Sequence, residues 1–300
     1  MSVKFFPIIK STEYDWPALD ENSALGLCYT SGTTGNPKGV ELTYENFTFE
    51  LQCIEEVIRF NPGDGYVSWL PLAHVFGQVA DNHLWARVAL HLYVVDNALH
   101  EVDYAKKVQP ALFIGVPRIY EKVYSNLKST MDSKAIIRIG LNIPILKKVL
   151  QKAVKKKIGM VNCKYAITGA APINPDILRM FHKVGVPLYE GYGMTETTAG
   201  ASINYKGNVK IGSVGRTLPG GTELKIDTDG EIMFRGRHVM KGYYNNPEAT
   251  AEVMDGEWLR SGDIGKIDSD GFVTITGRKK ELYISSGGKN IAPLLIEETM

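Results

Sequence analysis

The sequence has few cysteines, almost no excess charge and no long apolar run. Its three cysteines, Cys28, Cys53 and Cys163, are widely spaced and show no metal-ligand pattern. We therefore expect reduced, buried thiols rather than disulfides or a metal site. The 34 Lys and Arg residues nearly balance the 33 Asp and Glu residues, which argues against a nucleic-acid-binding protein. No apolar run approaches about 18 residues, so no membrane-spanning helix is predicted.

The N-terminus also lacks the apolar core that is typical of a signal peptide. We find no internal repeat and no low-complexity segment. A chain of 300 residues with 44% hydrophobic and 22% charged residues is typical of a soluble globular protein with two or more subdomains. Together these features predict a cytoplasmic protein.

A stretch rich in glycine and hydroxyl side chains, residues 29–40, is the strongest local signal. It follows an apolar run at residues 24–29, which predicts a buried strand. Glycines permit tight turns that direct backbone N–H groups at a ligand, and hydroxyls and a lysine add donors and charge. That chemistry suits nucleotide phosphates. The candidate phosphate-binding residues are Thr30, Ser31, Gly32, Thr33, Thr34, Gly35 and Lys38.

This stretch has two other interpretations. One is a flexible loop that joins a strand to a helix. The other is the common phosphate loop, which requires Gly, four residues and then Gly-Lys-Ser/Thr. Lys38 is followed by Gly39, so the common loop is excluded, and the order of residue types favours a phosphate role over a generic loop.

Two further candidates follow predicted strands of an α/β sheet. His74 comes after a strand expected at residues 66–70, and sheets of this kind bind ligands beyond the carboxyl ends of their strands. The other five histidines lack this context, so we interpret them as structural. Gly169, Ala170 and Ala171 follow a strand expected at residues 161–168, where small side chains let a planar group approach the backbone.

The order of predicted elements gives the fold class. Residues 84–117 alternate strand, helix and strand, which indicates parallel β/α units. Residues 209–277 contain short strands with Asp-Gly turns, which indicates antiparallel hairpins. We predict an α/β protein with a parallel-sheet β/α region at residues 1–208, a small antiparallel barrel-like subdomain at 209–277, and a final segment at 278–300.

Residues 144–158 predict a basic amphipathic helix. Pro144 suits the first helical position, and seven apolar residues at helical spacing predict one apolar face. Six lysines occupy the remainder of the helix. One interpretation is a surface helix that packs its apolar face on the domain. The other is peripheral contact with an anionic membrane surface.

The segment Gly-Tyr-Gly-Met-Thr-Glu-Thr at residues 191–197 is the second strong signal. Tyr192 offers a ring face for a purine, and Thr195 offers a hydroxyl for a phosphate oxygen. Glu196 offers a hard oxygen, the ligand type that Mg²⁺ prefers. The segment therefore predicts contacts with a nucleotide and its magnesium ion.

These motifs, in this order, resemble the adenylate-forming superfamily, which includes acyl-CoA synthetases, firefly luciferase and the adenylation domains of peptide synthetases. The segment Val-Pro-Arg-Ile-Tyr-Glu-Lys at residues 116–122 is similar to the long-chain and bubblegum-type fatty acyl-CoA synthetases. The resemblance extends from residue 29 to residue 290, which is nearly the whole chain.

The resemblance implies a role for each candidate residue. Ser31, Thr33, Thr34 and Lys38 would hold the departing pyrophosphate, and Glu196 would hold Mg²⁺. The remaining implied roles are adenine stacking by Tyr192, α-phosphate contact by Thr195, ribose contact by Asp263 and Arg278, and a place beside the substrate carboxylate for His74. The residues further implied to line the nucleotide or acyl pocket are Thr30, Gly32, Gly35, Gly169, Ala170, Ala171, Glu190, Gly191 and Gly193.

The reaction implied by the resemblance has two steps: a fatty acid and ATP give an acyl adenylate, and coenzyme A then displaces AMP. Lys280 falls at the family's hinge, and residues 285–290 resemble a turn that lines the path of the thiol. The family's C-terminal lysine domain is absent from the sequence, which predicts reduced activity and a separate lysine-bearing partner domain. The alternative is a non-catalytic module that binds ATP, AMP or acyl adenylate.

Overall fold

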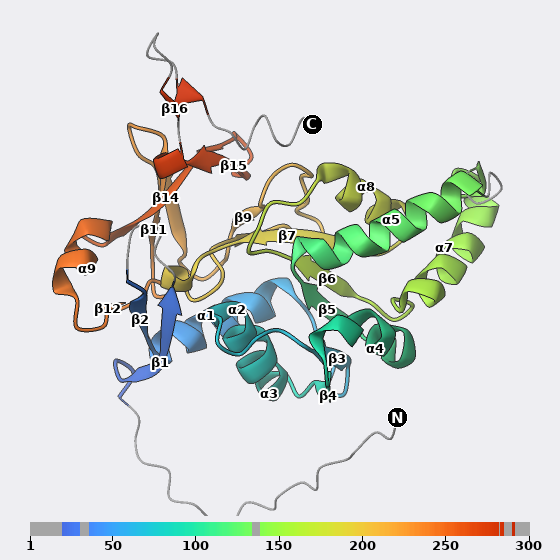
Figure 1. The fold of residues 1–300 in the computed structure, drawn as a ribbon, viewed down its shortest axis with the longest axis horizontal. Helices are drawn as coiled ribbons and strands as arrows, with labels where there is room; N and C mark the ends of the chain where they lie inside the picture. Colours follow the sequence, from blue (N-terminus) through green and yellow to red (C-terminus); the bar gives the residue numbers. More distant parts are fainter. Residues whose placement is uncertain (1–19, 31–35, 134–138, 282, 285–289, 292–300) are drawn as a thin grey trace, which may run out of the picture.

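The computed structural model describes residues 20–30, 36–133, 139–281, 283–284 and 290–291 (Figure 1). Most of their strands belong to two sheets, a larger one from the middle of the chain and a smaller one that follows it. In Figure 1, helices α5 and α7 lie at one end of the molecule, and the smaller sheet and helix α9 lie at the other.

The larger sheet contains seven strands in the order β4-β3-β5-β6-β7-β8-β9, and the first five run parallel. Strands β8 and β9 complete it in antiparallel orientation. Every residue of β5 and β6 is buried, which explains their continuous apolar sequences. The predicted parallel β/α region is confirmed. The strand bounds are β3 Gly65–Ser68, β4 His91–Val94, β5 Leu112–Gly115, β6 Tyr165–Thr168, β7 Leu188–Tyr192, β8 Ser202–Ile203 and β9 Arg216–Thr217.

Helices cover the larger sheet, and alternate residues of its strands face different cores. Leu112 and Ile114 of β5 pack in one core with Phe47 of α1, whereas Phe113 packs in a second core with Tyr120 of α5. The helix bounds are α1 Tyr44–Val57, α2 Val75–Gly77, α3 Trp85–Arg87, α4 Glu101–Val108, α5 Pro117–Ser133, α7 Pro144–Ile158, α8 Pro175–Lys183 and α9 Pro247–Val253. A π-helix, η1 Gln78–Leu84, and three short 3₁₀ helices, η2 Ala98–His100, η3 Thr195–Thr197 and η4 Lys279–Glu281, complete the described set.

In the sequence, Thr43 followed by Asn46 is typical of a helix start, and helix α1 begins there. Thr43 is the N-cap residue, and its hydroxyl accepts a hydrogen bond from the Asn46 backbone N–H while the Asn46 side chain accepts one from Thr43. This reciprocal pair is a capping box. The Asn46 amide also donates to the carbonyl oxygens of Arg237 and Val239, which ties the start of α1 to a segment far away in the sequence.

The smaller sheet is antiparallel, as predicted, and its order is β10-β11-β14-β13 with β15 paired to β14. Gly230 and Gly271 have positive φ in the turns after Asp229 and Asp270, which confirms the two Asp-Gly hairpin predictions. The division at residues 208 and 277 stays a prediction, and β9 beyond residue 208 still pairs with the larger sheet. The strand bounds are β10 Glu223–Ile226, β11 Glu231–Arg235, β13 Met254–Asp255, β14 Trp258–Ile267 and β15 Val273–Arg278.

A third sheet contains β1 Ala24–Thr30, β2 Lys38–Thr43 and β12 Gly242–Tyr243. The prediction that residues 24–29 form a strand is confirmed, but the prediction that this strand is buried is wrong. Leu25, Leu27 and Tyr29 are 44%, 42% and 59% exposed, and Cys28 is buried. The reason is that β1 is an edge strand with only β2 beside it in the sheet. A fourth sheet contains two antiparallel strands, β16 Tyr283–Ile284 and β17 Asn290–Ile291.

Helix α7 has the predicted bounds, but its apolar residues do not form one face. Leu150, Val154 and Ile158 pack on the core that includes α5 and α8. Ile145 and Val149 do not belong to this core and face solvent, with exposed fractions of 85% and 68%. The structure therefore divides the apolar residues between the core and solvent.

All three cysteines are free and buried, as predicted. Burial raises the pKa of Cys53 and Cys163 to about 12, so both remain protonated thiols. None of the described helices is long and apolar enough to cross a membrane.

Candidate functional site

The predicted phosphate stretch forms the connection between two antiparallel strands, rather than between a strand and a helix. Thr30 at the end of β1 pairs with Lys38 at the start of β2, and the Thr30 hydroxyl lies 3.4 Å from the Lys38 carbonyl oxygen. This pair closes the base of the loop. The candidates Ser31, Gly32, Thr33, Thr34 and Gly35 lie outside the described residues.

Lys38 lies beside a tyrosine that the sequence analysis missed. The Lys38 ammonium Nζ is 5.0 Å from the centre of the Tyr243 ring, a cation–π distance. The Tyr243 hydroxyl donates a 2.7 Å hydrogen bond to Oε1 of Glu196. Tyr243 therefore connects the predicted phosphate lysine with the predicted magnesium ligand. The residues of β12 reach this place because Tyr243 pairs with Val40 of β2.

Glu196 lies on η3, directly after β7, and only 7% of it is exposed. Its carbonyl oxygen accepts a hydrogen bond from the Met240 backbone N–H, so η3 is tied to the segment that leads to Tyr243. Gly193 is required before η3, because a Cβ there would lie 2.1 Å from the Ala199 carbonyl oxygen. The tight loop holds the carboxylate in a fixed place.

The donor set fits a magnesium ion that is bound mainly through its nucleotide. Among the described residues, no three His, Cys, Asp or Glu side chains cluster as metal ligands. Glu196 is a single buried carboxylate, with one oxygen held by Tyr243. Mg²⁺ commonly takes one or two protein carboxylates and completes its octahedron with phosphate oxygens and water. A site of this type is compatible with Glu196 alone.

Tyr192, Asp263 and Arg278 form a second cluster from three separate elements. The Tyr192 hydroxyl donates to Oδ2 of Asp263 at 2.6 Å, and the Arg278 Nε lies 3.0 Å from Oδ1. Burial raises the pKa of Asp263, and the hydrogen bond from Tyr192 and the charge of Arg278 act in the opposite direction. Each carboxylate oxygen has two lone pairs, so each can accept one more donor, such as a ribose hydroxyl. The structure thus brings together all three residues that the resemblance assigns to the nucleoside.

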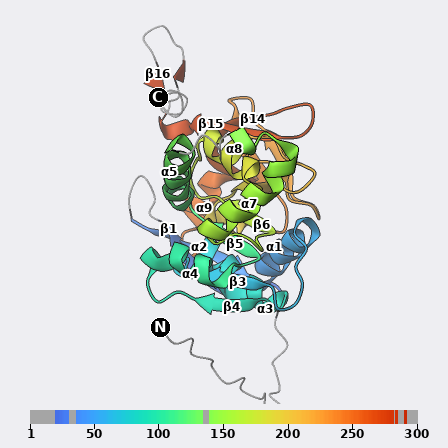
Figure 2. The same cartoon turned by 90° about the vertical axis from the view of Figure 1, so that its right-hand side faces the viewer.

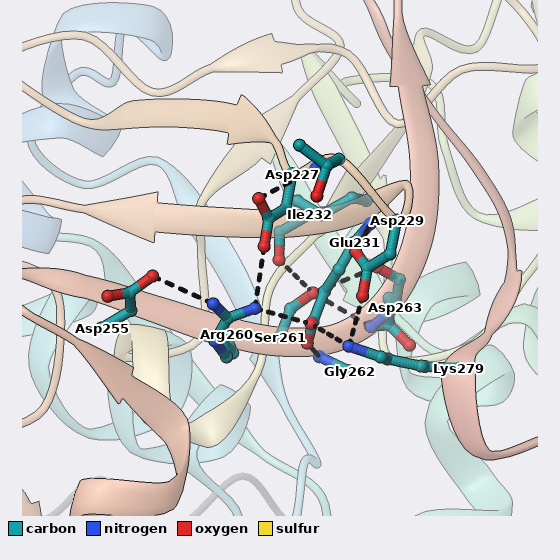
Figure 3. Close-up of polar contacts among 11 residues, drawn as sticks. Asp227, Asp229, Glu231, Ile232, Asp255, Arg260, Ser261, Gly262, Asp263 and Lys279 are labelled. Carbon is teal, nitrogen blue, oxygen red and sulfur yellow. Dashed lines mark hydrogen bonds and ion pairs between the residues drawn. The ribbon is translucent and has the colours of Figure 1, made fainter.

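The segment of β14 that carries Asp263 is held by Glu231, which the sequence analysis also missed. Glu231 Oε1 accepts a hydrogen bond from the Gly262 N–H at 2.9 Å, and Oε2 lies 2.7 Å from the Lys279 ammonium and 3.3 Å from Arg260 (Figure 3). Glu231 is 3% exposed. Because a buried carboxylate needs such partners, this network fixes the strand segment on which Asp263 lies.

The turn after β6 adjoins the end of β7. Thr168 pairs with Glu190 in the parallel register, and a Cβ on Gly169 would lie 3.2 Å from the Gly191 carbonyl oxygen. Ala170 has a φ of 66°, a strained conformation for alanine that is common at functional turns. Ala170 and Ala171 are exposed, whereas Glu190 is buried. These candidates therefore share the carboxyl edge of the sheet.

His74 is the N-cap residue of α2 and is exposed. Its side chain has no hydrogen bond or ion pair to any other described residue, including those of the two clusters. The backbone before it is held by buried Asp81, which accepts hydrogen bonds from the Tyr66 hydroxyl, the Ser68 hydroxyl and the Leu70 N–H. The position of His74 is thus set by the end of β3, while its role stays a prediction. Thr195 is half-buried at the start of η3, and its predicted contact also stays a prediction.

Residues 6–244 match the family described as AMP-binding enzyme, and the chain belongs to this family. The long-chain-fatty-acid–CoA ligase ACSBG2 of Gallus gallus is 35% identical over 320 residues, which cover 93% of this chain and 41% of that protein. The putative fatty-acid–CoA ligase fadD11 of Mycobacterium tuberculosis is 34% identical, covering 96% of this chain and 55% of that protein. The chain spans about half the length of these curated relatives.

Solved structures agree with this family. ATP-bound MatB from Rhodopseudomonas palustris has a TM-score of 0.74 and 27% identity, and the match covers 93% of this chain and 52% of that one. O-succinylbenzoate coenzyme A synthetase (MenE) from Bacillus subtilis, in complex with ATP and magnesium ion, has a TM-score of 0.72 and 25% identity, with 93% and 55% coverage. These similarities support the α/β fold and the recognition of the chain as an adenylate-forming protein.

Proposed function

We propose that the chain carries the nucleotide- and acid-binding part of an AMP-forming acid–thiol ligase, an acyl-CoA synthetase. The observation that carries this proposal is a pair of clusters, one of which includes Tyr192 at the end of β7 and the other Glu196 on η3 just after it. One cluster joins Lys38 to Glu196 through Tyr243, and the other joins Tyr192 to Arg278 through Asp263. The first has the charges that phosphates and magnesium require, and the second has the donors and acceptors that a nucleoside requires.

In the first proposed step, an oxygen of the substrate carboxylate attacks the α-phosphorus of ATP, and the bond to pyrophosphate breaks. Lys38 would neutralise charge on the departing pyrophosphate, and Glu196 would hold Mg²⁺, which would supply charge neutralisation at the phosphate oxygens. Thr195 donates to the α-phosphate. Phosphoryl transfer of this kind depends mainly on positioning and charge stabilisation, and the buried setting of Glu196 favours both.

In the second proposed step, the thiolate of coenzyme A attacks the acyl carbonyl carbon, and AMP leaves with the electron pair of the broken C–O bond. Asp263 and Arg278 keep hold of the ribose through both steps. Relatives carry further sequence beyond the matched region, since the chain spans about half of their length. We propose that a lysine-bearing C-terminal domain completes the site for the first step.

The proposed substrate is a long-chain fatty acid. Support comes from the curated relatives at 33–35% identity, several of which are named as long-chain-fatty-acid–CoA ligases. The solved neighbours carry other names, including o-succinylbenzoate coenzyme A synthetase, at about 25% identity. The sequence relatives therefore support the choice of acid. The solved structures, which include complexes with ATP and AMP, support the choice of nucleotide.

ATP–pyrophosphate exchange with fatty acids of several chain lengths tests the proposal. We expect exchange with long-chain acids, and we expect Glu196→Ala to reduce its rate about 10²–10³-fold, because one stabilising group of the transition state is lost. Glu257→Ala is the matched control, since the Glu257 side chain is 82% exposed, and it should leave the rate unchanged. Fusion of a relative's lysine-bearing domain after residue 300 should raise the rate.

The same assay separates the alternatives. Background exchange by both the chain and the fusion, together with measurable binding of ATP or AMP, would replace the ligase proposal with the non-catalytic nucleotide-binding module. Exchange with amino acids but not with fatty acids would replace the fatty acid with the substrates of the peptide-synthetase branch.

A further inference from the structure

Helix α7 presents unusually exposed apolar side chains. Ile145 is 85% exposed and Val149 is 68% exposed, and Leu146 on the helix and Ile143 and Ile139 before it are 45%, 40% and 56% exposed. In Figure 1 this helix lies at the end of the molecule away from the smaller sheet, and in Figure 2, where that end faces the viewer, α7 lies at the front. An apolar group of this kind on a protein surface indicates an interaction site.

The exposed residues continue into a row of lysines. Ile145, Val149, Lys152 and Lys156 are separated by four, three and four positions, so they form one stripe along the helix. We call these four residues the outer stripe. Lys152 and Lys156 are exposed like the two apolar residues. The apolar half lies near the N-terminus of the helix and the basic half near its C-terminus.

Among the described residues, the lysines of α7 have no acidic ion-pair partners. The helix contains six lysines and no aspartate or glutamate, and no described carboxylate forms an ion pair with any of the six. Lys148, Lys152 and Lys155 also line a groove of about 290 Å³ with Gln151 and Val161. A row of unpaired ammonium groups around a groove is complementary to phosphate groups.

The opposite side of α7 fixes the helix on the body of the protein. Leu150, Val154 and Ile158 pack on the core, and the Gln151 amide donates to the Lys183 carbonyl oxygen at 2.9 Å. The Gly159 N–H closes the helix on the Lys156 carbonyl oxygen. The outer stripe is therefore presented in one orientation before any partner binds, which lowers the entropic cost of docking.

We propose that the outer stripe of α7 docks on a membrane surface that contains anionic phospholipids. Ile145 and Val149 enter the boundary between headgroups and acyl chains. Lys152 and Lys156 of the stripe, together with Lys148 of the adjoining groove, contact lipid phosphates. This pattern of apolar and basic residues on one helix is typical of interfacial helices. A nucleic acid would use the lysines but not the apolar residues. The docking does not depend on the proposed ligase reaction.

Co-sedimentation of the 300-residue chain with vesicles tests the charge component. We expect binding to vesicles of phosphatidylcholine with about 30% phosphatidylserine and little binding to pure phosphatidylcholine, because each lysine near an anionic surface adds roughly 1 kcal/mol, about fivefold. Lys148→Gln with Lys152→Gln should weaken binding about 10–30-fold. Lys206→Gln with Lys266→Gln, two exposed lysines elsewhere, is the matched control and should leave binding unchanged.

The same assay tests the apolar component. Ile145→Ser with Val149→Ser should weaken vesicle binding at least tenfold, because both side chains lose burial in lipid. Val94→Ser with Leu99→Ser is matched in exposure, at 65% and 76%, and should have no effect. Thermal unfolding of each variant shows that it is folded. Wild-type binding that is equal on neutral and anionic vesicles, or that survives both α7 double substitutions, would overturn the proposal.

Discussion

Tyr243 is the residue on which the phosphate side of the candidate site depends most. Its ring lies under the Lys38 ammonium and its hydroxyl donates to Glu196. Burial and the nearby Glu196 carboxylate raise the pKa of Tyr243, so the hydroxyl keeps its proton and remains a donor at all ordinary pH values. Neither contact could be read from the sequence, because the three residues lie on three separate segments.

Replacing Tyr243 with phenylalanine keeps the ring and removes the hydroxyl. A hydrogen bond to a charged group contributes about 1.5–3 kcal/mol, and Glu196 would be left with one buried oxygen unpaired. We therefore expect ATP binding in the presence of Mg²⁺, measured by calorimetry, to weaken at least tenfold. Tyr244→Phe is the control, since Tyr244 is 52% exposed. Equal affinities of the two variants would contradict the assignment.

At the scale of elements, strand β11 supports the segment of β14 that carries Asp263. Glu231 at the start of β11 contacts the Gly262 N–H on β14 and Lys279 on η4, and it lies near Arg260 (Figure 3). One buried carboxylate thus links strands β11 and β14 of the smaller sheet with the helix η4. The sequence predicted the hairpin around Asp229-Gly230, but it did not indicate which side chain would face inward.

Replacing Glu231 with glutamine removes the charge and keeps a hydrogen-bond acceptor for Gly262. Lys279 and Arg260 are 43% and 30% exposed, so solvent offsets part of the loss. We expect the free energy of unfolding, measured by urea denaturation, to fall by about 1–3 kcal/mol. Glu223→Gln is the matched control: its partner Arg235 is a surface residue, and the expected change is at most about 1 kcal/mol. A change as small as that of the control would exclude a structural role for Glu231.

At the scale of the whole molecule, helix α1 connects the larger sheet with the segments that lead into the smaller one. His238 is fully buried between Phe49 of α1 and Phe234 of β11. Neither of its ring nitrogens has a hydrogen-bond partner among the described residues. Burial lowers the pKa of His238 from 6.5 to about 4, because a charged ring would be desolvated there.

This pKa predicts an acid-sensitive fold. Between pH 6.5 and 4 the histidine is protonated in the unfolded chain but neutral in the native state, so the unfolded state binds more protons and stability falls as the pH falls. Over this pH range the free energy of unfolding falls by about 3 kcal/mol because of His238. Above pH 6.5 this histidine has no effect on stability. Urea denaturation of wild type and His238→Phe across this range measures it. We expect a flatter pH profile for the variant, and parallel profiles would show that His238 is not responsible.

Local patterns in the sequence determined most of the architecture. The alternation of strands and helices predicted the parallel sheet, and the Asp-Gly pairs predicted two hairpins. Thr43 and Asn46, which form the capping box of α1, are a typical helix start in the sequence. These features depend on backbone preferences and on residues close together in the chain, so they could be read directly. The order of motifs likewise placed the chain in its family.

Only the tertiary structure decided which side chains meet and which face solvent. Tyr243 and Glu231 contact the candidate site because strands distant in sequence pair there. Strand β1 is exposed because it lies at an edge, and the apolar residues of α7 are divided because the core covers only one side of that helix. Burial depends on what packs against an element, and that neighbour is specified by the whole chain rather than by the element's own sequence.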